Sequence, residues 1–212
     1  MTVAALPALL DGQHLIETFG VVGVLLIVFA ETGLLIGFFL PGDSLLFAAG
    51  YAATGELSPS LHPNIALVCL GVSAMAILGA QTGFVIGRRM GPALFDREES
   101  RFFKKSYVTK AEGVIERYGA GRAIVLARFV PIVRTFLNPL VGAGGLPART
   151  FLVWNVVGGL LWGTGVTLAG YYLGQVDWIG KRLEVVAVIV VGISVSPIAF
   201  ELLKARRRRR SS

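Results

Sequence analysis

Two acids and two arginines are the residues of this chain whose types and spacing point to chemistry. Arg128 and Arg134 flank Pro131 in a stretch that otherwise has the composition of a membrane segment, and Glu31 and Asp43 lie in an equally apolar region. A charge at mid-bilayer costs about 2.5–3.5 kcal/mol on insertion scales, so it is retained for pairing or for function. Guanidinium groups suit phosphate oxygens, and carboxylates exchange protons. We therefore expect a phosphate headgroup at the arginines and proton coupling or charge pairing at the acids.

Plainer interpretations of the same residues stay open. The acids and arginines can form permanent salt bridges with no further role, and Asp43 can cap a helix that begins at Ser44. Whether the acids titrate or only pair with the arginines is not decided by their positions. His14 and His62 have no partner at metal-ligand spacing, and Cys69 is the one cysteine. We therefore expect no metal site and no cofactor.

The segments that must position these charges have the composition of broken helices. Pro131 removes a backbone donor between arginines that would lie about 120° apart on one continuous helix. In the first half, Pro41 and Gly42 interrupt an apolar run that resumes for only nine residues. Nine residues cannot cross about 30 Å as a helix. We expect re-entrant hairpins at 31–54 and 123–145, with Pro41, Gly42 and Pro131 as the breaks.

The bulk composition is that of a polytopic membrane protein. The chain has 212 residues, of which 54% are hydrophobic, and a soluble domain of this size would not be so apolar. Full spans are expected at 65–87, 151–173 and 183–203. Glycines recur every four residues in the first two of these spans, which predicts close helix contacts. These stripes consist of Gly79, Gly83 and Gly87, then Gly159 with Gly163, and Gly170 with Gly174.

Basic residues are concentrated in two segments of the chain. None of the 20 lysines and arginines precedes Arg88, whereas nine fall in 88–122 and six in 204–210. This is the positive-inside pattern of a membrane protein, and it argues against nucleic acid as a partner. We expect the 91–121 linker, which includes an amphipathic helix, and the C-terminus to face the cytoplasm. Three apolar segments lie between the linker and the tail, and three crossings would place the tail outside. One segment must therefore fail to cross, and we expect it to be 123–142.

Together these patterns predict an all-α membrane domain of two inverted repeats. Each repeat has a re-entrant helical hairpin followed by glycine-striped transmembrane helices, an arrangement typical of transporters. We expect one domain over 1–212. Its parts are a first repeat at about 15–90, the basic linker at 91–121, a second repeat at about 122–203 and a basic tail at 204–212.

An ordered series of short motifs resembles the DedA family, also called the VTT or SNARE-associated Golgi group. The series covers roughly 25–175 in the order found in the family, and as a whole it is highly specific. Its members are Glu31-Thr-Gly33, Phe39-Leu-Pro-Gly-Asp-Ser44, Gly87-Arg88, Arg128-Phe-x-Pro131-x-x-Arg134, Ala143-Gly144 and Phe151-x3-Asn155-x2-Gly158-x3-Trp162.

This resemblance implies a multi-pass protein of the cytoplasmic membrane that moves undecaprenyl phosphate or phospholipid between leaflets, with coupling to the proton gradient. It also implies essential roles for Glu31, Asp43, Arg128 and Arg134. Membrane lipids and protons would be its partners, and the oligomeric state is open. The alternatives are a membrane scaffold without transport of its own and a lipid-phosphate enzyme. Such hydrolysis commonly uses a nucleophilic histidine or a metal cluster, so we expect no enzyme.

Overall fold

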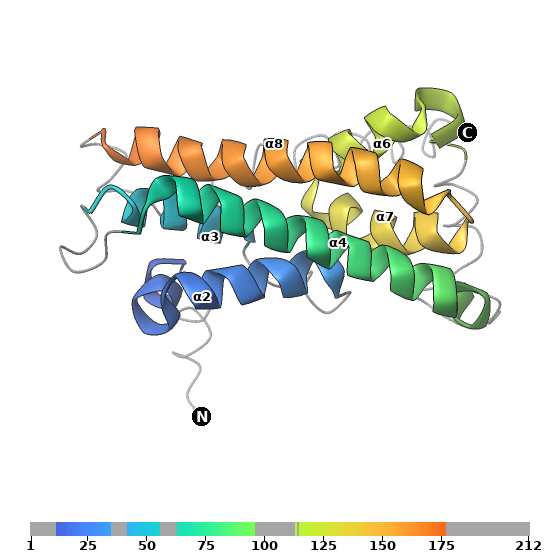
Figure 1. The fold of residues 1–212 in the computed structure, drawn as a ribbon, viewed down its shortest axis with the longest axis horizontal. Helices are drawn as coiled ribbons and strands as arrows, with labels where there is room; N and C mark the ends of the chain where they lie inside the picture. Colours follow the sequence, from blue (N-terminus) through green and yellow to red (C-terminus); the bar gives the residue numbers. More distant parts are fainter. Residues whose placement is uncertain (1–11, 35–41, 56–62, 96–112, 114, 177–212) are drawn as a thin grey trace, which may run out of the picture.

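Every regular element in the described part of the chain is an α-helix. The computed structural model describes residues 12–34, 42–55, 63–95, 113 and 115–176 (Figure 1). The all-α class expected from the sequence is confirmed over these residues. The helices are α2 (Gly12–Gly33), α3 (Gly42–Ala52), α4 (Ile65–Phe95), α6 (Ala120–Ala127), α7 (Pro131–Ala143) and α8 (Ala148–Gly174).

Two long helices, α4 and α8, run the length of the molecule. They contain apolar stretches of 27 residues each, Ile65–Gly91 and Ala148–Gly174. At 1.5 Å per residue such a stretch is about 40 Å long, enough to cross a bilayer. The two helices pack against each other and run in opposite directions, as the colours in Figure 1 show. α4 begins where the first expected span begins, at Ile65, and continues beyond the end of that span to Phe95.

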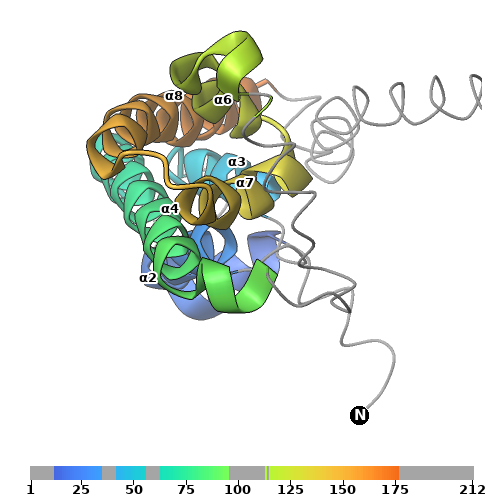
Figure 2. The same cartoon turned by 90° about the vertical axis from the view of Figure 1, so that its right-hand side faces the viewer.

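The short helices α3 and α7 each pack against a long helix from the other half of the chain. α3 lies on α8, and α7 lies on α4. In Figure 1 they lie toward opposite ends of the long helices, and in Figure 2 they are flanked by α8, α4 and α2. α3 has 11 residues and α7 has 13. Their lengths of about 17 and 20 Å fall short of a bilayer core.

Glycines mark the places where these helices cross. A Cβ added at Gly170 on α8 would lie 2.7 Å from the Phe47 backbone carbonyl carbon on α3. On α4, a Cβ added at Gly87 would lie 2.6 Å from the corresponding atom of Pro139 on α7. The predicted stripes are therefore confirmed as packing features, since each lets two backbones approach closely.

The molecule buries charged side chains within a largely apolar interior and exposes large apolar side chains on its outer surface. Arg128 and Arg134 are only 4% and 2% exposed, whereas Leu67 and Leu161 are 69% and 55% exposed. Large apolar side chains cover the outer faces of α4 and α8, where a soluble protein would expose polar groups. This arrangement suits a chain whose solvent is the hydrocarbon of a bilayer.

The predicted helix break between the two arginines is confirmed. α6 ends at Ala127, residues 128–130 form a turn, and α7 starts at Pro131, where a missing N–H costs no hydrogen bond. Pro139 lies within α7 without ending it. Several expected features fall outside the described residues. They are the break at Pro41, most of the 91–121 linker, the third span at 183–203 and the tail at 204–212.

Candidate functional site

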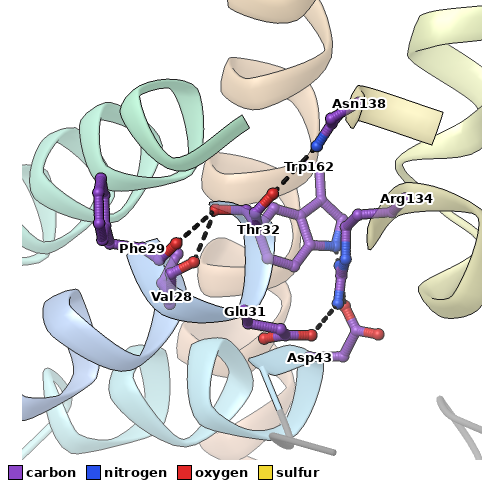
Figure 3. Close-up of polar contacts among 8 residues, drawn as sticks. All are labelled: Val28, Phe29, Glu31, Thr32, Asp43, Arg134, Asn138 and Trp162. Atoms are coloured by element: carbon purple, nitrogen blue, oxygen red, sulfur yellow. Dashed lines mark hydrogen bonds and ion pairs between the residues drawn. The ribbon is translucent and has the colours of Figure 1, made fainter. Parts of the chain in front are cut away.

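Three helix ends converge on one buried cluster of charges (Figure 3). Glu31 lies in the last turn of α2, Asp43 in the first turn of α3, and Arg134 in the first turn of α7. Trp162, from the middle of α8, supplies an aromatic wall. The cluster therefore joins side chains from both halves of the chain, with sequence separations of about a hundred residues.

Arg134 is the centre of this cluster and binds both carboxylates. Its Nη2 donates to Glu31 Oε1, and its Nη1 donates to Asp43 Oδ1 at 3.1 Å. The face of the guanidinium lies over the Trp162 ring, with Cζ 4.2 Å from the ring centroid. The Trp162 indole N–H donates to the same Asp43 oxygen at 2.8 Å. Arg134, both acids and the tryptophan thus form one closed network of charge-assisted hydrogen bonds and a cation–π contact.

The helix ends explain why these charges need one another. Asp43 lies at the N-terminus of α3, where the helix dipole favours a negative charge. Arg134 lies at the N-terminus of α7, where the dipole disfavours a positive charge, so the two carboxylates offset that cost. The Glu31 carboxylate lies against Gly42, and a side chain at position 42 would occupy the same space. A carboxylate therefore sits where an anion binds at a helix N-terminus.

Arg128 has a different environment. It follows α6, and its Nη2 donates to the amide oxygen of Asn155 on α8 and to the Ala76 carbonyl on α4 at 3.3 Å. Asn155 is fixed in turn, because its Nδ2 donates to the Ile77 carbonyl at 3.0 Å. Among the described residues Arg128 makes no ion pair, and its Nη1 has no hydrogen-bond acceptor. Its charge is buried and held by neutral groups.

The structure thus brings together three of the four charges that the sequence singled out. Glu31, Asp43 and Arg134 are in direct contact, whereas Arg128 is held separately by hydrogen bonds. Asp43 lies within α3 rather than before it, and its side chain bonds Arg134 and Trp162. Pro131 and Gly42 are the first residues of α7 and α3, respectively. The substrate and proton roles of these residues stay predictions.

Two contributors were not assigned to the site from the sequence. Trp162 is the last residue of a motif in the sequence, and its N–H bonds a carboxylate; a buried indole N–H usually needs such a partner. Asn138 donates to the Thr32 carbonyl at 3.0 Å and so satisfies the end of α2. Asn155, which belongs to the same motif, bonds across helices to Arg128 and to the Ile77 carbonyl. A polar side chain inside an apolar span was the available signal for both asparagines.

Metal ligands do not gather in the part of the chain that the structure describes. No group of three His, Cys, Asp or Glu side chains converges there as a metal site would require. The polar groups that do converge are guanidinium, carboxylate, amide and indole. Such groups bind anions and exchange protons, which is the chemistry open to this site.

Comparisons with known proteins point to one family. The VTT domain matches residues 40–172. An uncharacterized membrane protein of Mycobacterium tuberculosis (strain H37Rv) is 42% identical over 216 residues, covering 99% of this chain and 93% of its own. The protein DedA of Escherichia coli (strain K12) is 39% identical over 183 residues, covering 86% of this chain and 81% of its own. No solved structure matches the chain.

Proposed function

The chain belongs to the DedA family of VTT-domain membrane proteins, and we propose that it moves lipid phosphates between the leaflets of the cytoplasmic membrane. Undecaprenyl phosphate and phospholipids are the candidate cargoes, and protons are the coupling ion. The observation that carries this proposal is Arg128. It is a buried guanidinium with no carboxylate partner among the described residues, inside a protein whose outer surface is apolar.

A lone buried charge calls for a counter-ion. Removing one member of a buried ion pair typically costs about 3–5 kcal/mol, because the remaining charge is uncompensated. Arg128 has no counter-ion in direct contact among the described residues, and a phosphate would supply one. The N-terminus of α7 begins three residues further on and carries a partial positive charge, which favours anions in this part of the protein.

The arrangement of helices supports re-entrant hairpins in inverted repeats. α3 and α7 are too short to span, their first turns meet at the charge cluster, and they extend toward opposite ends of the molecule in Figure 1. Each crosses the long helix of the other half. Such half-helices, whose ends meet near mid-membrane, form the substrate sites of many secondary transporters. In this proposal the repeats are 15–90 and 122–203.

Exposed arginines support a cytoplasmic orientation for one end of the molecule. Arg88 and Arg89 near the end of α4, Arg122 in α6 and Arg149 in α8 are all exposed. These segments lie toward the same end in Figure 1. By the positive-inside rule this end faces the cytoplasm, which agrees with a cytoplasmic linker at 91–121 and a cytoplasmic C-terminus.

Charge balance supports coupling to protons. Glu31, Asp43, Arg128 and Arg134 together are formally neutral when all four are ionised. A phosphate monoanion that binds at Arg128 makes this buried group negative, and a proton taken up by either carboxylate restores neutrality. Because an unbalanced charge is costly at this depth, phosphate binding and proton uptake favour each other. Arg128 is almost fully buried, so the lipid enters when the hairpins part, as in alternating access.

Transport and not catalysis is the proposed activity. Among the described residues no histidine or cysteine nucleophile lies in the buried cluster, and Oδ1 of Asp43 accepts two hydrogen bonds. A scaffold that recruits partners through its basic tail is the competing function. It makes the buried charges dispensable for activity, which a direct measurement can test.

The test is leaflet exchange of fluorescent lipid phosphates by the purified protein in liposomes, with and without a pH gradient. We expect exchange by wild type, and none by Arg128→Ala or Glu31→Ala at equal insertion. Arg128→Lys should be nearly as impaired, since an ammonium lacks the planar fork. Arg122→Ala, which removes an exposed arginine from the neighbouring helix, is the matched control and should exchange normally. Full exchange by Arg128→Ala would exclude the arginine from the mechanism, and no exchange by wild type would favour the scaffold.

A further inference from the structure

The two buried arginines differ in what is left for a ligand to bind. On Arg134 both terminal nitrogens bond carboxylates, one face is covered by Trp162, and only Nε lacks an acceptor among the described residues. On Arg128 it is the terminal nitrogen Nη1 that lacks one, and no acid contacts the group. Both terminal nitrogens of Arg134 are therefore taken by carboxylates, which repel a phosphate or must be displaced by it, whereas Arg128 offers a terminal nitrogen with no acid beside it.

The wall of α8 is shaped around the Arg128 side chain. A Cβ added at Gly158 would lie 2.9 Å from Arg128 Cδ, and one at Gly159 would lie 3.6 Å from its Cζ. On the same face, Asn155 accepts from Nη2 and is itself anchored to the Ile77 carbonyl. The two glycines leave room for the guanidinium, and Asn155 fixes one of its nitrogens, which orients the other.

From this difference we propose that Arg134 is a structural ion pair and that Arg128 alone binds the phosphate, with Asn155 as its positioning residue. The inference rests on the proposed function and narrows it, because the sequence assigned substrate binding to both arginines. The ligand class is a phosphate monoester or a phosphodiester. The shared chemistry is an anionic phosphate oxygen, and it can come from a lipid headgroup or from free phosphate.

An asparagine, and not an aspartate, at position 155 is what leaves the charge of Arg128 available for an anion. An amide holds a guanidinium by hydrogen bonding and leaves its charge unbalanced, whereas a carboxylate at the same place would neutralise it. Arg134, six residues further along the chain, is neutralised in this way, because two carboxylates contact its guanidinium.

The experiment compares Asn155→Asp with Asn64→Asp and Asn155→Ala by thermal unfolding of the purified full chain in detergent. Asn64 caps α4 by accepting from the Ala66 N–H at 2.9 Å, and aspartate caps equally well, so it is the matched control for the same substitution. Each protein is titrated with inorganic phosphate, with a short-chain lipid phosphate and with a phosphate-free lipid of equal chain length. A ligand that binds the folded state raises the melting temperature with its concentration.

We expect wild type and Asn64→Asp to be stabilised by the lipid phosphate and not by the phosphate-free lipid. Asn155→Asp should melt at least as high as wild type without ligand but lose the phosphate response, because its carboxylate occupies Arg128. In Asn155→Ala, Arg128 keeps its charge but loses the hydrogen bond to Asn155. This variant should need at least roughly tenfold more ligand for the same rise in melting temperature, as expected for the loss of a hydrogen bond to a charged group. If Asn155→Asp fails to fold, this shift for Asn155→Ala decides the question.

Two results would overturn these ideas separately. A wild-type response in both variants at position 155 refutes the inference and leaves the proposed function standing. A wild-type protein that responds to no phosphate compound refutes the proposed function itself. A response to lipid phosphate alone assigns the site to a lipid headgroup, and an equal response to inorganic phosphate assigns it to the phosphate group by itself.

Discussion

Replacing Asp43 separates its structural role from its proposed role in coupling. Its Oδ1 accepts from Arg134 Nη1 at 3.1 Å and from the Trp162 indole at 2.8 Å. Asparagine retains a carbonyl oxygen at that position, so both donors keep an acceptor. Arg134 also keeps its ion pair with Glu31. Asp43→Asn therefore mimics the protonated acid with the network in place, whereas Asp43→Ala removes the acceptor altogether.

The two substitutions are expected to differ in cost. Alanine leaves both Arg134 Nη1 and the indole N–H without an acceptor, at about 1–3 kcal/mol each and more for the charged donor. The sum of roughly 2–6 kcal/mol is a large part of the whole stability of many domains, so Asp43→Ala should accumulate poorly. Asparagine exchanges charge-assisted hydrogen bonds for neutral ones, at roughly 1–3 kcal/mol, and should remain folded.

The assay is lipid-phosphate exchange in liposomes over a series of imposed pH gradients. Asp43→Asn should still bind the lipid phosphate, but its exchange rate should no longer depend on the gradient, because position 43 can no longer exchange a proton. The level of folded protein in detergent provides the control for stability. A gradient dependence as steep as that of wild type in Asp43→Asn would refute the assignment of Asp43 as the coupling group.

Two further predictions concern topology and packing. Single cysteines at Ser58, Ser100 and Ser211, in a variant lacking Cys69, should react with an impermeant reagent from outside the cell only at Ser58; labelling at Ser100 would contradict the proposed orientation. Gly170→Ala should destabilise the protein by about 1–3 kcal/mol, because its Cβ would meet the Phe47 backbone, whereas Gly165→Ala has nothing within 4 Å and should be neutral or stabilising by up to about 1 kcal/mol. Equal melting temperatures for the two alanine variants would show that the α3–α8 contact does not depend on a glycine.

Local features of the fold were predictable because single residues dictate them. A proline between Arg128 and Arg134 cannot continue a helix without losing a hydrogen bond, and the break lies there. Glycines at four-residue spacing predicted helix contacts, and the crossings contain them. α4 runs past its expected end at Gly87 to Phe95, because Arg88 and Arg89 are good helix formers that a helix tolerates once it leaves the apolar region.

The partners of these features were not predictable from the sequence. A glycine stripe indicates that another backbone packs closely there, but it does not identify the partner. The sequence alone therefore does not show that α3 lies on α8 and α7 on α4. Likewise, two arginines six residues apart are chemically identical in the sequence. Which of them reaches Glu31 and Asp43 depends on where the first turn of α7 points, and that is set by packing among four helices. The same packing brings Trp162 to Asp43 and so turns an apparent packing residue into a hydrogen-bond donor.

Each short helix packs on the long helix of the other half of the chain, and this has a consequence for biosynthesis. Asp43 and Trp162 are separated by 119 residues, so at roughly 5–20 residues per second a ribosome takes about 6–24 s between them. Arg134 follows Asp43 only after 91 residues, and α8 is still incomplete when Trp162 is added, so for most of that interval α3 has neither its counter-charge nor its packing surface. The N-terminal half therefore cannot reach its final position alone. We therefore expect the final packing to form after the C-terminal half has been made, and a nascent chain arrested after α4 should be a substrate for quality-control proteases.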